Sequence, residues 1–101
     1  ADMLSSRHLV IAIPDPTRLG CGREGIFERL VRRGINTTIH YIPIYRHPFH
    51  AARLTASPEC PTAEWYYRHA VTLPCHPTMT DDDVATVVGA LTTPLGYQTI
   101  F

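Results

Sequence analysis

The chain has 101 residues, 45% of them hydrophobic, which suffices for one compact domain and argues against disorder. Nine basic residues balance nine acidic ones, which excludes nucleic acid and anionic membranes as partners held by net charge. No apolar run approaches the roughly 20 residues of a membrane span, and the first residues lack the pattern of a secretory signal. We therefore expect a cytoplasmic protein.

The N-terminal residues predict a strand and then a loop. Residues 7–13 form a short apolar run closed by Pro14, which is typical of a strand. Residues 15–22 are rich in Pro and Gly and indicate a loop.

A helix is predicted over residues 23–33. Its apolar residues fall on one stripe, namely Ile26, Phe27, Leu30 and Val31. The charged residues, Arg29 among them, are expected on the outer side. Gly34 fits the left-handed position that ends many helices, with Ile35 folding back onto the last turn.

Residues 35–42 predict a second strand, because side chains of a strand alternate between two faces and apolar residues recur here. In such a strand His40 and Tyr41 emerge on opposite faces. The pattern over 44–61 is irregular and rich in aromatic residues, with one helical turn expected around 49–54.

The last part of the chain predicts a helix, a short strand and a further helix. The first helix spans 61–70 and the strand 71–75. The last helix begins at a Thr80 cap, with carboxylates over 81–83 in its first turn, and Pro94 is expected to stop it.

This order of elements predicts an α+β fold, with a small, largely antiparallel sheet and helices packed on one side. We expect one domain over residues 1–101, with an ordered core from about 7 to 94 and a tail over 95–101.

The basic residues are all arginines, and the chain contains no lysine. Among side chains, only a lysine amine can be tuned to condense with an aldehyde cofactor, because a guanidinium stays protonated. The chain alone therefore cannot form a Schiff base with such a cofactor.

Three segments carry a resemblance to a known family. Residues 34–45 read G-I-N-T-T-I-H-Y-I-P-I-Y and resemble the "G-I-x-x-x-x-H-Y-x-P-h" signature in the C-terminal domain of DegT/DnrJ/StrS nucleotide-sugar aminotransferases. Residues 60–64 are similar to that family's "F-P-x-A-E", and residues 72–80 to its "S-L-P-h-h-P-x-h-T". Cys60 and Cys75 depart from the family, since aromatic or large apolar residues are usual there.

The resemblance implies the small domain of a fold-type-I aminotransferase that uses pyridoxal 5'-phosphate. The cofactor and the catalytic lysine then belong to a large domain outside this chain, so this chain alone has no catalytic or cofactor-binding residue. The intact enzyme would be a homodimer that moves an amino group, from glutamate as the expected donor, to a keto group of a nucleotide-linked sugar for cell-envelope polysaccharide. Residues 40–49 look most like the branch acting on UDP-4-keto-6-deoxy-N-acetylhexosamines.

Five residues are candidates for substrate binding on this resemblance: His40, Tyr41, Tyr45, Arg46 and His47. Arg46 could meet a diphosphate as a bidentate donor. Structural roles that involve no substrate also remain open for these residues. A strand histidine can be satisfied by a neighbour, Tyr41 can pack in the core, and Arg46 can lie solvated in a loop.

Two other classes of function remain open. Six histidines and three cysteines could supply a zinc site, although no CxxC or HxxxH pair accompanies them. The odd number of cysteines favours reduced thiols over a disulfide framework. The third hypothesis is an α+β interaction domain with no chemistry of its own.

Overall fold

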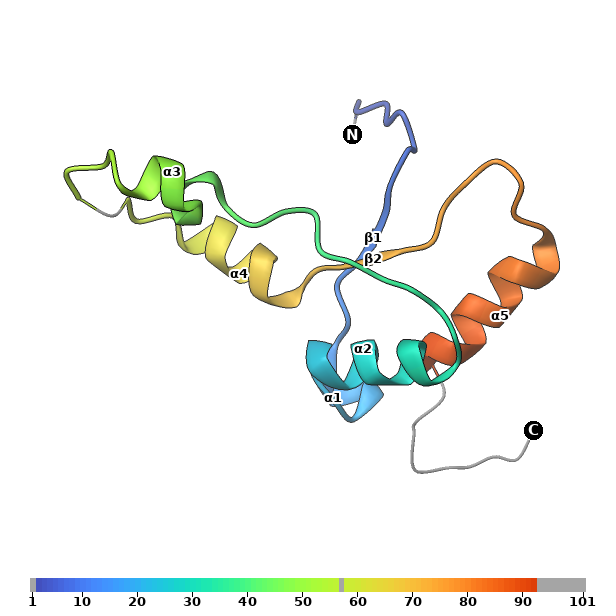
Figure 1. Cartoon of the computed structure of the whole chain (residues 1–101). Helices are drawn as coiled ribbons and strands as arrows, with labels where there is room; N and C mark the ends of the chain where they lie inside the picture. The colour runs from blue at the N-terminus through green and yellow to red at the C-terminus, as the bar shows by residue number, and fades with distance from the viewer. Residues whose placement is uncertain (1, 57, 93–101) are drawn as a thin grey trace.

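The computed structural model describes residues 2–56 and 58–92, and it confirms the α+β class with a small antiparallel sheet and helices (Figure 1). The elements in chain order are β1 (Val10–Ala12), α1 (Pro16–Leu19), α2 (Arg23–Arg32), the 3-10 turn η1 (Ile44–Arg46), α3 (Pro48–Ala51), α4 (Pro61–His69), β2 (Val71–Leu73) and α5 (Asp81–Thr92). In Figure 1, α1, α2 and α5 lie on one side of the crossing of β1 and β2, and α3 and α4 form an arm that extends away from it.

The sheet consists of β1 and β2, which pair antiparallel with Ile11 opposite Thr72 at the centre. Both strands were predicted, and both are three residues long. Pro74 follows β2 directly, where its missing N–H removes no ladder bond.

The predicted strand over 35–42 is wrong. A single bridge, between Thr38 and Thr72, is formed there. The Thr37 hydroxyl donates to the Thr72 carbonyl. In a regular strand pair, a backbone N–H would donate to that carbonyl oxygen instead. Threonine competes with regular backbone pairing in this way.

The loop expected over 15–22 contains α1. The Asp15 carboxylate accepts the Thr17 N–H at 2.9 Å, and Pro16 occupies the first turn. Gly20 ends the helix in the left-handed conformation, with φ of 72°. The Pro and Gly that indicated a loop are therefore the start and stop residues of a short helix.

The end of α2 follows the prediction. Gly34 has φ of 72°, and its N–H donates to Val31 at 3.0 Å, while the Ile35 N–H donates to Leu30 at 2.9 Å. This pair of bonds is the Schellman motif. It turns the chain so that Ile35 is buried against the helix it has just left.

The hydrophobic core lies between α2, β2 and α5. Its buried members are Ile26, Leu30, Ile35, Val71, Val87 and Ala90. Val31, predicted on the buried stripe, is 63% exposed. Helix α2 and helix α5 contact each other, and Ile26 and Leu30 from α2 are fully buried.

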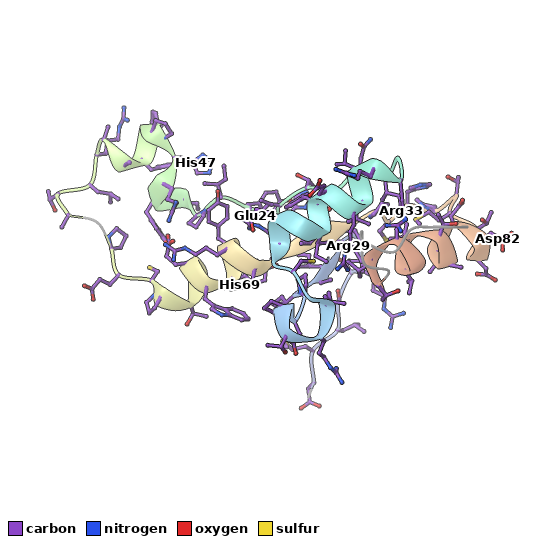
Figure 2. The ribbon with its side chains drawn as sticks, turned by 90° about the horizontal axis from the view of Figure 1, so that it is seen from below. Glu24, Arg29, Arg33, His47, His69 and Asp82 are labelled. Atoms are coloured by element: carbon purple, nitrogen blue, oxygen red, sulfur yellow. The ribbon has the colours of Figure 1, made fainter. Side chains whose placement is uncertain are left out.

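Arg29 was predicted to face outward, and this was wrong. Only 3% of it is exposed, and Figure 2 shows it between α2 and α5. Its guanidinium donates to the carbonyls of Leu19, at 2.6 Å, and Leu91, at 3.0 Å. These carbonyls belong to the last turns of α1 and α5, which lack helical donors.

Helix α5 begins as predicted. The Asp83 N–H donates to the Thr80 hydroxyl at 3.1 Å, and the Thr80 N–H donates to the Asp83 carboxylate at 2.9 Å. The Thr80 backbone bond lowers the pKa of Asp83. The expected stop at Pro94 and the tail over 95–101 lie outside the described residues.

The molecule is extended, with a Cα radius of gyration of 16.4 Å against about 13 Å for a compact chain of this length. The described part of the chain contains no helix long and apolar enough to cross a membrane.

Candidate functional site

His40 is held against the sheet by Thr72. The Nδ1 atom of His40 lies 2.9 Å from the Thr72 hydroxyl oxygen, and the Thr72 N–H donates to the Thr38 carbonyl at 2.9 Å. The Tyr41 ring meets the His40 ring edge to face, with centroids 4.5 Å apart. The expectation that the two side chains emerge on opposite faces was therefore wrong, because the chain bends at His40 instead of continuing as a strand.

An open hollow of about 760 Å³ begins at this pair. One wall is the segment from His40 to Ile44, and the other is the first turn of α4 with Tyr66. Tyr41 is 66% exposed and Ile44 is 69% exposed. Apolar side chains with few polar groups are typical of a ligand-binding surface.

A second open hollow, of about 580 Å³, shares Cys60 and Pro61 with the first. It is lined by Tyr45 and Arg46 from η1 and by Glu64 from α4. The structure thus brings four of the five predicted residues, all except His47, to two adjoining hollows.

Glu64 is the common partner of three other residues that line the second hollow. The Arg46 guanidinium donates from Nε to one carboxylate oxygen at 2.9 Å and from a terminal nitrogen to the other at 2.5 Å. The Tyr45 hydroxyl donates at 2.8 Å, and Arg68 lies 3.7 Å away. Two donors from η1 and one carboxylate from α4 therefore join these elements.

The bonds to Glu64 shift the titration of all three groups. The Arg46 guanidinium, followed by the Tyr45 hydroxyl, lowers the pKa of Glu64 from 4.5 to about 2. The same carboxylate raises the pKa of Arg46. Desolvation, and then the bond to Glu64, raises the pKa of Tyr45. Glu64 is therefore ionised and Tyr45 is a neutral donor at neutral pH.

Tyr67 links this cluster to α2. The Arg46 guanidinium carbon lies 5.3 Å from the centre of the Tyr67 ring, and that of Arg23 lies 5.6 Å from it. Arg23 also donates to the Tyr67 carbonyl. Both contacts are within the range of cation–π attraction.

His47 lines neither of these hollows. Its Nε2 atom lies 3.2 Å from the Ile42 carbonyl oxygen. A carbonyl can only accept, so the ring donates its Nε2 proton to this turn. Figure 2 shows His47 near α3, away from the body of the molecule.

Two residues of the site could not be assigned from the sequence. Glu64 belongs to a family motif, but its spacing gives no sign of a pair with Arg46, 18 residues earlier. Thr72 falls in a predicted strand. Threonine is common in strands, so its presence there does not indicate a bond to His40. Only the folded chain brings each to its partner.

The zinc hypothesis gains no support, since no three His, Cys, Asp or Glu side chains among residues 2–56 and 58–92 are grouped to hold a metal ion. Cys21, Cys60 and Cys75 are free thiols.

The residues present do not fit pyridoxal phosphate. The chain has no lysine to bond its aldehyde. Arg46 lines the second hollow, but its guanidinium already forms a bidentate pair with Glu64 and is not free to bind the cofactor phosphate.

Residues 2–92 match the DegT/DnrJ/EryC1/StrS aminotransferase family. The chain belongs to this family. An uncharacterized protein of Methanocaldococcus jannaschii is 38% identical over 85 residues, and the spore coat polysaccharide biosynthesis protein SpsC of Bacillus subtilis is 31% identical over 86. Each match covers 83% of this chain and 22% of the relative.

Solved structures of aminotransferases share the fold of this family member. Helicobacter pylori PseC, an aminotransferase involved in the biosynthesis of pseudoaminic acid, aligns with a TM-score of 0.72 at 29% identity, over 86% of this chain and 23% of PseC. The aminotransferase TlmJ of Streptoalloteichus hindustanus aligns with a TM-score of 0.71 at 27% identity, over 88% of this chain and 22% of TlmJ. The chain thus spans between a fifth and a quarter of the length of the proteins it resembles.

Proposed function

We propose that this chain is the C-terminal, substrate-facing domain of a pyridoxal-phosphate-dependent aminotransferase. The intact enzyme transfers an amino group from glutamate to a keto group of a nucleotide-linked sugar. The observation that carries the proposal is an open hollow, bordered by His40 and Tyr41, in a member of an aminotransferase family. The similarity to PseC and SpsC supports a UDP-4-keto-6-deoxy-N-acetylhexosamine as substrate and a role in cell-envelope polysaccharide.

The proposed roles of the site residues follow from their exposure and donors. His40 and Tyr41 border the sugar, because both residues line the first hollow, whose other residues are mainly apolar. Tyr45 and Arg46, in the adjoining hollow, lie where the diphosphate would extend. Arg46 would exchange the Glu64 carboxylate for a phosphate, the other anion that a guanidinium fork binds through two parallel bonds. His47 shapes the turn between the two hollows.

The remaining machinery lies in the rest of the protein. Residues 1–101 form one domain in this proposal, while the lysine and the cofactor site belong to a large domain. The extended shape and the exposed apolar residues of the sheet edge and arm, among them Val10, Ile13 and Phe49, fit a piece whose surface other parts cover. The intact enzyme is a cytoplasmic homodimer, and this chain alone is inactive.

The test uses the full-length protein encoded around this segment. Purified with pyridoxal phosphate, it should convert UDP-4-keto-6-deoxy-N-acetylhexosamine to the amino sugar with glutamate, detected by mass spectrometry. The isolated chain should form no borohydride-stable cofactor adduct. A stop codon or an unrelated domain before Ala1, or no amination of any keto nucleotide sugar by cofactor-loaded protein, would overturn the proposal.

The site is tested by variants in the same protein. His40→Gln and Tyr41→Ala should each lower kcat/KM for the nucleotide sugar by roughly 10-fold or more, the value of a lost hydrogen bond or ring contact. His50→Gln is the matched control, because His50 is exposed and lines neither hollow. Equal effects at positions 40 and 50 would remove His40 from the site.

A further inference from the structure

Thr72 is a buried residue whose hydroxyl has one hydrogen-bond partner among residues 2–56 and 58–92. It lies at the centre of β2 and is 5% exposed. Its N–H donates to the Thr38 carbonyl, and its carbonyl accepts from the Thr37 hydroxyl. Within the described residues, its hydroxyl oxygen contacts Nδ1 of His40 at 2.9 Å and no other hydrogen-bonding atom.

This arrangement selects one tautomer of His40. A hydroxyl carries one proton, and a neutral imidazole has one N–H and one bare nitrogen. If His40 donated from Nδ1, the Thr72 proton would be left without an acceptor at a buried position, which is costly. If the Thr72 hydroxyl donates to a bare Nδ1, both groups are satisfied and the ring proton resides on Nε2.

We propose that Thr72 is a positioning residue that holds His40 as the Nε2–H tautomer, so that His40 donates a hydrogen bond to an oxygen of the bound sugar substrate. Because Nδ1 is occupied by Thr72, Nε2 is the ring nitrogen available to a ligand in the first hollow, which His40 lines. The partner is therefore an acceptor, such as a carbonyl, a hydroxyl oxygen or a phosphate oxygen. This inference rests on the proposed function, in which His40 borders the substrate.

The bond can be removed without disturbing the strand. Thr72→Val keeps the branched shape that suits a buried strand, and it retains the backbone groups that bind Thr37 and Thr38. Thr72→Ser keeps the hydroxyl. Thermal melting of both variants checks that the fold persists.

The experiment measures the two half-reactions of the full-length enzyme separately. Thr72→Val should lower kcat/KM with the nucleotide sugar by roughly 5- to 20-fold, and Thr72→Ser should stay within about 3-fold of wild type. The half-reaction with the amino donor should be unchanged in both. A loss of folded enzyme would lower the two half-reactions together.

A double-mutant cycle with His40→Gln separates positioning from packing. A glutamine at position 40 has no ring nitrogen at the Nδ1 position for Thr72 to orient. Thr72→Val should therefore cost less than about 2-fold in the His40→Gln background. An equal cost in both backgrounds would show that Thr72 acts by packing and would overturn the inference.

The two proposals fail differently. If His40→Gln impairs the sugar half-reaction but Thr72→Val does not, the positioning role is wrong and the site stands. If neither His40→Gln nor His40→Ala affects that half-reaction, the site itself is wrong, and the role of Thr72 falls with it.

Discussion

A terminal nitrogen of Arg29 donates to the Leu91 carbonyl oxygen at 3.0 Å, so a buried cation closes the last turn of α5. The second terminal nitrogen donates to Leu19 at the end of α1. No carboxylate is bonded to this guanidinium within the described residues. The negative ends of two helix dipoles offset its charge instead.

Replacing this arginine should destabilise the chain. Arg29→Met keeps the apolar stem but leaves two carbonyls without donors, and we expect the free energy of unfolding to fall by about 2–3 kcal/mol. Urea denaturation followed by circular dichroism measures it. Arg33→Met is the control, because Arg33 is exposed at the end of the same helix, and a loss within about 0.5 kcal/mol is expected there. Comparable losses at both positions would contradict the role given to Arg29.

Alanine substitutions at two glycines should change the free energy of unfolding in opposite directions. Gly34 has a positive φ, so Gly34→Ala should cost roughly 1–2 kcal/mol of unfolding free energy. Gly89 lies inside α5, and the position that an alanine methyl would take there is open space, so Gly89→Ala should add about 0.5–1 kcal/mol. Thermal and urea unfolding of the two variants measures both changes in unfolding free energy. If both variants were stabilised, or both destabilised, the prediction would be refuted.

The Glu64 cluster should make stability depend on pH in the acid range. The pKa of Glu64 is about 2 in the folded chain against 4.5 ordinarily, so folding favours the ionised form. The stability that ionised Glu64 contributes is present above pH 4.5, declines as the pH falls and is lost as the pH passes below about 2. The difference in Tm between wild type and Glu64→Gln should therefore shrink from pH 6 to pH 2.

The control for this titration is Glu28→Gln. Glu28 pairs with Arg32 on an exposed face of α2, where such pairs contribute little. Its Tm difference from wild type should be small across the same pH range. A Glu64→Gln difference that stays constant with pH would argue against the lowered pKa.

The roles of Arg46 and Glu64 can be distinguished by how their variants change KM for the nucleotide sugar. If Arg46 meets the diphosphate, Arg46→Gln in the full-length enzyme should raise KM for the nucleotide sugar by roughly 10-fold or more. Glu64→Gln, which frees Arg46, should not raise it. Steady-state kinetics with both variants decides this, and a matching rise in both would indicate that Arg46 serves only to hold η1 on α4.

Local signals account for the parts of the fold that the sequence predicted correctly. The Thr80 cap, the Gly34 stop and the apolar stripe of α2 each act within a few residues. The prediction of a strand at 35–42 was wrong because pairing there depends on a residue that is distant in the sequence. Whether Thr37 pairs through its backbone or its hydroxyl depends on Thr72, which is 35 residues away.

The candidate site shows the same division. His40 and Tyr41 could be named from a motif, but their mutual contact depends on a bend that alternation could not reveal. Arg29 was assigned outward because it is not part of the apolar stripe of α2. Its partners are two helix ends, and only the packing of α1 and α5 against α2 brings these to it.

The core and the candidate site occupy different parts of the chain. Every buried core residue lies outside η1, α3 and α4, while η1 and α4 supply half or more of the residues that line each hollow. Because distant substitutions act nearly independently, side chains of the arm can change with little effect on the packing of α2 and α5. The residues that line the hollows could therefore be exchanged while the packing of α2 and α5 is kept.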